Sequence, residues 1–137
     1  MMDRLFVDTG AWCPFFNTAD PGHNAVTGVL EQWEHRLVTT AYVFDELVTL
    51  LRHRVHHRAA VLAGRALRSG DLALMLTPEP ADIETAWQLF ERSRDKAYSF
   101  TDCVSFAVMR RLGVKTAATL DAHFRQAGFQ VLPAGNV

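Results

Sequence analysis

The chain has 137 residues, of which 49% are hydrophobic and 21% are charged, and its formal net charge at pH 7 is −1. This length and composition are typical of a globular protein with one core, so residues 1–137 are expected to form a single domain. A net charge so close to zero excludes a general attraction to nucleic acids or membranes, and any polyanionic partner must be bound by a local cluster of basic residues.

The cysteine content and the N-terminal sequence predict the cellular compartment. The two cysteines, Cys13 and Cys103, form no CxxC motif, and the N-terminal segment has no secretory pattern. We therefore expect a cytoplasmic protein with reduced thiols and without a cysteine-based zinc site. Charged residues and histidines interrupt every apolar run before it reaches the roughly 20 residues that span a bilayer, so no membrane partner is expected.

Apolar periodicity and breaker residues divide the first half of the chain into alternating strands and helices. The breaker at residues 20–22 (Asp-Pro-Gly) ends the first helical segment, and the threonines at 39 and 40 can cap the helix that follows their strand. The expected elements are a strand at 3–8, a helical turn from 10, a helix at 25–34, a strand at 36–40 and a helical pattern at 41–69 that bends near His56.

The second half of the chain continues this alternation. Gly70 ends the long helical pattern, and Gly113 supplies the C-cap of a later helix. The expected elements are a strand at 72–76, helices at 80–95 and 101–112, a strand at 114–120, a short helix at 122–126 and a strand at 129–132. This order predicts an α/β fold, a three-layer α/β/α sandwich with a central parallel sheet.

Two aspartates lie at the carboxyl ends of expected strands. Asp8 comes after the apolar run Leu5–Val7, and Asp121 comes after the small and β-branched run Val114–Leu120. Sites in open parallel sheets form at the carboxyl ends of the strands, so neighbouring strands would bring both carboxylates together. Two such charges repel each other, and they need a cation or a shared proton.

Two further acids lie among apolar residues of expected helices. Glu46 shares a helical face with Val43, Leu47 and Leu50, whereas its neighbour Asp45 falls on the solvated face. Asp102 shares its face with Phe106 and Met109, close to the start of a helix. A structural interpretation also exists for Asp102, because Ser99 and Asp102 have the spacing of a capping box.

The four acids Asp8, Glu46, Asp102 and Asp121 therefore occupy strand ends or inward helix faces. A carboxylate cluster of this kind suits hard divalent cations such as Mg²⁺ or Mn²⁺. These cations polarise phosphoryl oxygens and activate water, so the cluster predicts metal-dependent hydrolysis of a phosphodiester bond.

The acids lie in four sequence blocks that resemble a known family. The blocks are VDTGAW at 7–12, AYVFDE at 41–46, SFTDC at 99–103 and TLDAHF at 119–124. Their order and spacing resemble PIN-domain proteins, and more closely the VapC-type toxins of toxin–antitoxin modules. The resemblance implies an α/β/α sandwich, a metal-dependent ribonuclease that forms a homodimer, and inhibition by an antitoxin whose C-terminal segment occupies the active-site groove.

The same resemblance implies roles for individual residues. Asp8, Glu46, Asp102 and Asp121 would be the acidic quartet. Thr9 would help to orient Asp8, and Thr119 would support Asp121. Asp95 occupies a plausible position for a further acid, with a helix-end or loop residue as the alternative interpretation. Gly10 stands where the family often has a hydroxyl residue.

Binding of RNA requires local positive charge, which the helical segment after Glu46 contains. Arg52, Arg54 and Arg58 are the expected RNA-binding residues, and a solvated helix face is the alternative. His123 could donate a hydrogen bond to phosphate or simply be hydrogen-bonded within the protein. His53 and His57 have helical spacing, but without further ligands they do not predict a zinc site.

Two functions from different classes fit these patterns. The first is a metal-dependent endoribonuclease, the toxin of a toxin–antitoxin pair that inhibits translation. The second is a non-catalytic module that keeps the PIN fold and binds RNA or protein. The presence of all four acids favours the enzyme.

Overall fold

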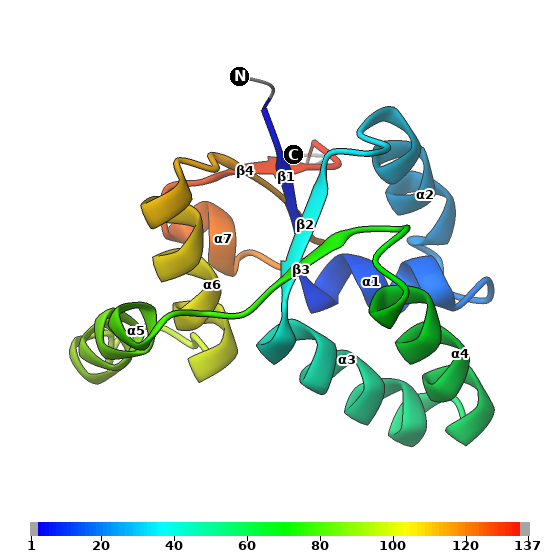
Figure 1. Ribbon diagram of the computed structural model, residues 1–137, viewed down its shortest axis with the longest axis horizontal. Coiled ribbons are helices and arrows are strands. Elements are labelled where there is room, and N and C mark those ends of the chain that lie inside the picture. Colours follow the sequence, from blue (N-terminus) through cyan, green and yellow to red (C-terminus); the bar gives the residue numbers. More distant parts are fainter. Residues whose placement is uncertain (1–2, 135–137) are drawn as a thin grey trace.

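A five-stranded parallel sheet flanked by seven helices is formed by residues 3–134, the part of the chain that our computed structural model describes (Figure 1). In chain order the elements are β1 (Leu5–Val7), α1 (Thr9–Phe16), α2 (His23–Gln32), β2 (Leu37–Thr40), α3 (Ala41–Arg54), α4 (His57–Arg68), β3 (Leu74–Leu76), α5 (Pro80–Arg92), α6 (Phe100–Leu112), β4 (Thr116–Ala118), α7 (His123–Gln126) and β5 (Gln130–Leu132).

The strand order is β3-β2-β1-β4-β5, and every neighbouring pair is parallel. The chain therefore begins at the centre of the sheet, builds one half outward through β2 and β3, and then returns to build the other half through β4 and β5. The register places Val7 opposite Ala118. This pairing brings the carboxyl ends of β1 and β4 together, where the strand order reverses and where α/β proteins form their binding sites.

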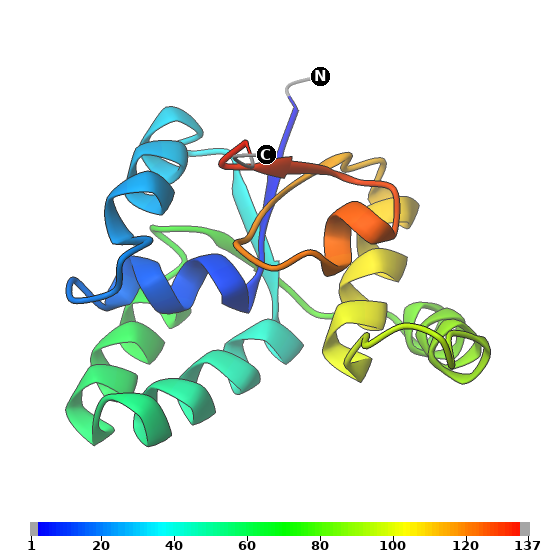
Figure 2. The same cartoon turned by 180° about the vertical axis from the view of Figure 1, so that it is seen from behind.

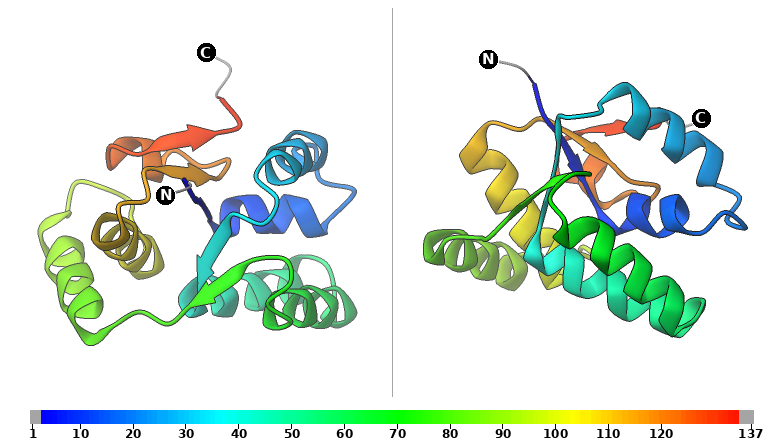
Figure 3. Two further views of the ribbon diagram at one scale, coloured as in Figure 1. Left: turned by 45° about the horizontal axis from the view of Figure 1, so that its top comes forward. Right: turned by 45° about the vertical axis from the view of Figure 1, so that its right-hand side comes forward.

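The helices form a layer on each side of the sheet. In Figure 1, α1 to α4 lie to the right of the central strands and α5 to α7 lie to the left, and the view from behind in Figure 2 shows the same separation. Helices α3 and α4 pack against each other, as do α5 and α6 (Figure 3). Fully buried side chains such as Phe6, Trp12, Phe106 and Phe124 fill the core. The predicted three-layer α/β/α sandwich is confirmed.

The predicted bend near His56 is a complete break between two helices. Val55 leaves the helical conformation, with φ −118° and ψ −89°. His56 is extended, and its Nδ1 accepts a hydrogen bond from the Ala59 N–H (3.0 Å), which caps α4. The side-chain cap satisfies a backbone donor at the start of the new helix, so the chain can turn and fold α4 back along α3.

Several predicted strands and helices are longer than those in the structure. Each strand has only three or four residues, and Asp8 lies outside β1 as the N-cap of α1. Helix α5 ends at Arg92, because residues 93–96 form a turn closed by the Lys96 N–H and the Ser93 carbonyl (3.0 Å). The predicted C-cap at Gly113 is confirmed, with φ +70°. None of the helices in residues 3–134 combines the length and apolar character needed to cross a membrane.

Candidate active site

The four predicted acids line one cavity at the carboxyl ends of the strands. Asp8 enters from the end of β1, Glu46 from α3, Asp102 from the first turn of α6, and Asp121 from the loop after β4. The cavity has a volume of about 460 Å³. Its wall also includes Thr9, Gly10, Cys13, Pro14, Asp20, Leu50, Arg54, Ser99, Leu120 and His123.

Asp8 is the most buried of the four acids, with 2% of its surface exposed. Its Oδ2 accepts hydrogen bonds from the Gly10 N–H (3.1 Å) and the Thr119 hydroxyl (2.9 Å). Its Oδ1 is buried and has no hydrogen-bond partner within residues 3–134. Burial raises the pKa of Asp8 to about 8, and the charges of Asp121 and Asp102 act in the same direction. The two hydrogen bonds to Oδ2 oppose this rise only in part.

Asp102 is held by the start of its own helix. The Ser99 N–H donates to Asp102 Oδ2 and the Asp102 N–H donates to Ser99 Oγ, both at 3.0 Å, so the predicted capping box is confirmed. His123 Nδ1 lies 2.7 Å from the same Oδ2. Burial raises the pKa of Asp102, although the contacts with Ser99 and His123 lower it. Capping therefore occupies one oxygen of Asp102 and leaves Oδ1 for another partner.

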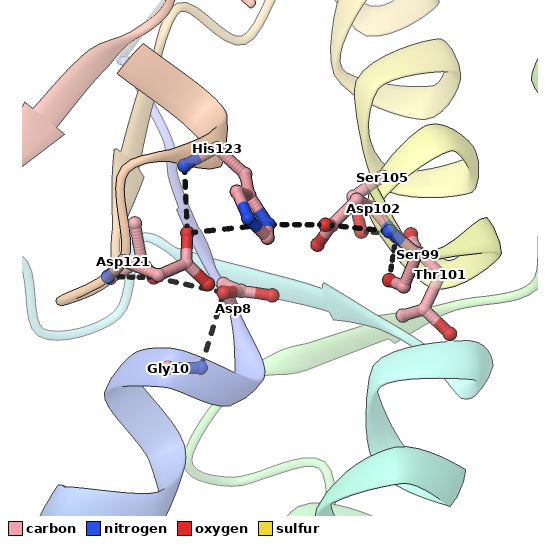
Figure 4. Close-up of polar contacts among 9 residues, drawn as sticks. Asp8, Gly10, Ser99, Thr101, Asp102, Ser105, Asp121 and His123 are labelled. Atoms are coloured by element: carbon pink, nitrogen blue, oxygen red, sulfur yellow. Dashed lines mark hydrogen bonds and ion pairs between the residues drawn. The ribbon is translucent and has the colours of Figure 1, made fainter. Parts of the chain in front are cut away.

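Asp121 is held by the loop that follows β4. Its Oδ1 accepts a hydrogen bond from the His123 N–H (3.0 Å), and its own N–H donates to the Thr119 hydroxyl oxygen (3.3 Å). Because the Thr119 hydroxyl also donates to Asp8, this one side chain connects the two aspartates. Figure 4 shows Asp8, Asp102 and Asp121 around His123. Thr119 was predicted to support Asp121, and its side chain contacts both acids.

The three aspartates share one pattern, in which the protein holds one oxygen and leaves the other without a hydrogen bond. The held oxygens are Asp8 Oδ2, Asp102 Oδ2 and Asp121 Oδ1, and the other oxygen of each has no donor among the described residues. Among these free oxygens of the described residues, Asp8 Oδ1 is buried, whereas the Asp121 side chain is 41% exposed. A buried oxygen without a donor is rare in proteins, because its desolvation is then uncompensated. A divalent cation with a preference for oxygen ligands would compensate Asp8 Oδ1 and bind the open oxygens of the other two aspartates, so the donor set fits the predicted Mg²⁺ or Mn²⁺.

Glu46 faces the aspartates from α3 and is half-buried. Burial raises its pKa, the Thr9 hydroxyl acts in the opposite direction, and the charges of Asp102 and Asp121 raise the pKa further. Thr9 was predicted to orient Asp8. Its buried hydroxyl lies near enough to Glu46 to affect the pKa of that carboxyl, but its geometry does not meet that of a hydrogen bond to any described residue. The orientation of Asp8 comes from Gly10 and Thr119 instead.

Gly10 is required by the close approach of Thr119. A Cβ atom at position 10 would lie 2.5 Å from Thr119 Oγ1, which is too close, and 3.2 Å from Asp8 Oδ2, which is a tight contact. The space expected for a hydroxyl side chain at position 10 is therefore taken by the hydroxyl of Thr119. Asp95 lies outside the cavity, in the turn after α5, where its side chain is 79% exposed and pairs with Lys96 (3.7 Å).

The three predicted RNA-binding arginines occupy different places. Arg54 lines the acidic cavity. Arg52 contacts His57 and lines a separate groove between α3 and α4, and Arg58 lines a shallow depression on α4. The structure thus brings only Arg54 of these three to the acids.

Cys13 and Asp20 were not expected in the cavity, and His123 was expected either to donate to phosphate or to be hydrogen-bonded within the protein. The contact of His123 with Asp121 could have been predicted from its position two residues after that aspartate, because an aspartate often accepts a hydrogen bond from the N–H two residues further on. Burial raises the pKa of Cys13 to about 11, and the charge of Arg54 opposes this rise. The Cys13 thiol therefore stays protonated and is a poor nucleophile at neutral pH.

Comparisons with known proteins show which family the chain belongs to. The PIN domain family matches residues 5–130. The 23S rRNA-specific endonuclease VapC20 of Mycobacterium tuberculosis is 36% identical over 126 residues, which cover 91% of this chain and 95% of the relative. The chain belongs to the VapC family of PIN-domain ribonucleases. A second member, Ribonuclease VapC26 of Mycobacterium tuberculosis, is 30% identical over 121 residues, covering 88% of this chain and 89% of VapC26.

Solved structures support the same assignment for this VapC-family chain. The crystal structure of Mycobacterium tuberculosis VapC20, a sarcin–ricin loop cleaving toxin, has a TM-score of 0.86 at 34% identity and covers 91% of this chain and 95% of VapC20. FitAcB from Neisseria gonorrhoeae has a TM-score of 0.70 at 18% identity, with 93% and 95% of the two chains covered, and shares the fold. The predicted family, the PIN-like fold and the assignment as a VapC-type endoribonuclease toxin are confirmed.

Proposed function

We propose that this VapC-family chain cleaves RNA by hydrolysis that depends on Mg²⁺ or Mn²⁺. The observation that carries the proposal is the set of three aspartates, each with one oxygen fixed by the protein and one left without a donor. Asp8, Asp102 and Asp121 would hold the ion, and Glu46 would complete the acidic ring from α3. When bound, the ion would polarise a phosphoryl oxygen and lower the pKa of a bound water.

The protein contributes rigidity and charge to this reaction. Thr119, Gly10 and Ser99 fix carboxylate oxygens through hydrogen bonds of 2.9–3.1 Å, so the aspartates need little rearrangement when a substrate enters. The ring of acids repels a phosphodiester unless a cation neutralises it. Arg54 lies in the same cavity wall and would contact a phosphate of the RNA backbone. Arg52 and Arg58 would contact phosphates further along the strand.

A relative with high coverage supports a proposal for the substrate class. VapC20 is named for action on 23S rRNA, and its crystal structure is that of a sarcin–ricin loop cleaving toxin. We propose that this chain also cuts a structured ribosomal RNA loop, and so inhibits translation. Mapping new 5′ ends on total RNA after brief induction would locate the cut. Cleavage confined to messenger or transfer RNA would contradict the ribosomal substrate but not the nuclease.

The test of the reaction uses purified protein with total RNA. Cleavage should require Mg²⁺ or Mn²⁺, stop on chelation, and be abolished in Asp8→Asn while the circular dichroism spectrum stays unchanged. Asp45→Asn is the matched control, because Asp45 is an exposed acid next to Glu46 on the outer side of α3. An active Asp8→Asn protein would overturn the assignment. RNA binding without cleavage in the presence of either ion would favour the non-catalytic module.

The proposed partners are an antitoxin and a second copy of the chain. An antitoxin would place a segment in the acidic cavity and would be encoded by a small open reading frame directly upstream. Its co-expression should abolish toxicity and RNA cleavage together. The homodimer and the cytoplasmic location stay predictions, and light scattering on the purified protein would measure the mass of the assembly.

A further inference from the structure

His123 lies inside the acidic cavity, between Asp102 and Asp121 (Figure 4). Its Nδ1 is 2.7 Å from Asp102 Oδ2 and 4.0 Å from Asp121 Oδ1. One nitrogen of His123 and one oxygen from each of these aspartates all lie within 4.8 Å of one another, a separation that one metal ion can bridge.

The imidazole is fixed from two directions. The backbone N–H of His123 donates to Asp121 Oδ1 (3.0 Å), which orients the start of α7. The ring of Tyr98 packs edge-on against the imidazole, with 5.9 Å between the ring centres. The side chain is 27% exposed, so it forms part of the cavity wall and is not a mobile surface group. A ligand held in this way loses little conformational freedom when it binds an ion.

We propose that His123 supplies a nitrogen ligand to the ion held by Asp102 and Asp121, so that the site has mixed nitrogen and oxygen ligands. The inference rests on the proposed metal-dependent function and adds a residue to it. A second observation also points to a cation in this cavity. Asp8 Oδ1 is buried and has no hydrogen-bond partner among residues 3–134, in an aspartate that is only 2% exposed.

A nitrogen ligand changes which ions the site prefers. Mg²⁺ binds oxygen ligands and keeps several waters, whereas imidazole suits transition metals. We therefore expect Mn²⁺ to bind more tightly than Mg²⁺. We also expect removal of the imidazole to weaken Mn²⁺ binding more than Mg²⁺ binding. If carboxylates alone bound the ion, the preference for Mn²⁺ over Mg²⁺ would not depend on residue 123.

The main alternative is that His123 only donates a hydrogen bond to Asp102. Two variants separate the two roles. His123→Ala removes both the hydrogen bond and the ligand, whereas His123→Asn keeps an N–H donor near the position of Nδ1 but has no imidazole nitrogen. His53→Ala is the matched control, because His53 is an exposed histidine on α3 and does not line the cavity.

Calorimetric titration with Mn²⁺ and Mg²⁺, without RNA, measures the effect directly. Loss of a side chain that merely supports a ligand costs about 10–100-fold in metal affinity. We expect both His123 variants to lose at least about tenfold in Mn²⁺ affinity, to lose less for Mg²⁺, and His53→Ala to match the wild type. Recovery of Mn²⁺ affinity in His123→Asn would show that His123 only orients Asp102, and would overturn the proposal.

Pulsed electron paramagnetic resonance on the Mn²⁺-loaded wild type tests the bond without any substitution. A directly bound imidazole couples its ¹⁴N nucleus to the Mn²⁺ electrons, and labelling the histidines with ¹⁵N should change this coupling. Mn²⁺ binding without histidine coupling would overturn the ligand role and leave the proposed nuclease intact. A wild type that binds neither ion would overturn both proposals.

Discussion

Helices α5 and α6 begin with the same local motif but place their aspartates in opposite surroundings. Asp82 and Asp102 are each the third residue of a helix, each forms a capping box, and they are only 3% and 4% exposed. Arg111 donates to both oxygens of Asp82, from Nε at 2.8 Å and from Nη2 at 2.9 Å, and this contact lowers the pKa of Asp82. Asp102 has no arginine or lysine partner among the described residues, and burial raises its pKa.

The difference supports a structural role for Asp82 and the proposed metal-binding role for Asp102. The chain itself neutralises Asp82 with a paired hydrogen bond from a guanidinium, which ties α5 to α6. Around Asp102 the chain supplies three further aspartates and a glutamate in the same cavity, with only Arg54 and His123 as basic residues of its lining, so a bound cation would balance the excess negative charge. Clustered acids with raised pKa values are typical of functional sites, whereas a paired buried acid is usually structural.

Replacing Asp82 or Asp102 singly by asparagine gives the largest expected difference, one variant losing stability and the other losing activity. Asn keeps an oxygen that can accept the capping hydrogen bond, so each variant removes mainly the charge. Asp102→Asn should lower kcat/KM at least about a hundredfold, since even supporting residues of a metal site cost 10–100-fold. Asp82→Asn should keep its activity but lose about 1–3 kcal/mol in the free energy of unfolding, the usual cost of a lost charged hydrogen bond.

RNA cleavage assays and urea unfolding at pH 7 measure both effects. Arg111→Gln is a matched variant for Asp82→Asn, because it removes the other half of the same pair. The comparison would fail if Asp102→Asn lost stability with little loss of activity, since Asp102 would then be a structural cap like Asp82.

The local features of the fold and of the site could be predicted from the sequence. The alternation of strands and helices predicted the parallel sheet, and the spacing of Ser99 and Asp102 predicted the capping box of α6. The four acids were recognised because each lies at a strand end or on an apolar helix face. These signals all lie within a few residues of the side chain concerned.

The remaining features depend on contacts between distant parts of the chain. The Thr119 hydroxyl reaches Asp8 across 111 positions, and Arg111 reaches Asp82 across 29. No local pattern tells which of two capping aspartates meets an arginine in the folded protein. The break at His56 was similarly hidden, because a histidine side chain is an unusual helix cap.

The pH dependence of stability should distinguish the two kinds of aspartate. Without divalent ions, the pKa of Asp8 is raised from 3.8 to about 8 in the folded protein. Between these values the folded state keeps a proton that the unfolded state has released, so stability falls as the pH rises toward 8. Asp82 has the opposite sign, because its pKa is lowered by folding. Its contribution is present at neutral pH and is lost as the pH falls below 4.

Melting temperatures in a chelating buffer from about pH 2 to pH 9 test these signs. Asp8→Asn should flatten the decline between about pH 4 and pH 8. Asp82→Asn should lower the melting temperature at neutral pH and flatten the loss of stability below pH 4. Added Mn²⁺ should raise the melting temperature more at pH 8 than at pH 5, because the ion binds the ionised aspartates. A wild type whose stability rises steadily between pH 5 and pH 8 in chelator would contradict the raised pKa of Asp8.

The smallest expected effect concerns Arg54, which, unlike Arg111, has no acid partner among the described residues. Arg54 lines the acidic cavity but forms no ion pair within residues 3–134, so its guanidinium remains available to an RNA phosphate. Arg54→Gln should weaken RNA binding and reduce the slope of log affinity against log salt by about one. Arg52→Gln and Arg58→Gln should change the slope less, because these side chains lie outside the cavity. RNA-binding isotherms in the inactive Asp8→Asn background measure the salt slopes of all three arginine variants. Equal slopes would show that Arg54 contributes no more to RNA binding than Arg52 and Arg58 do.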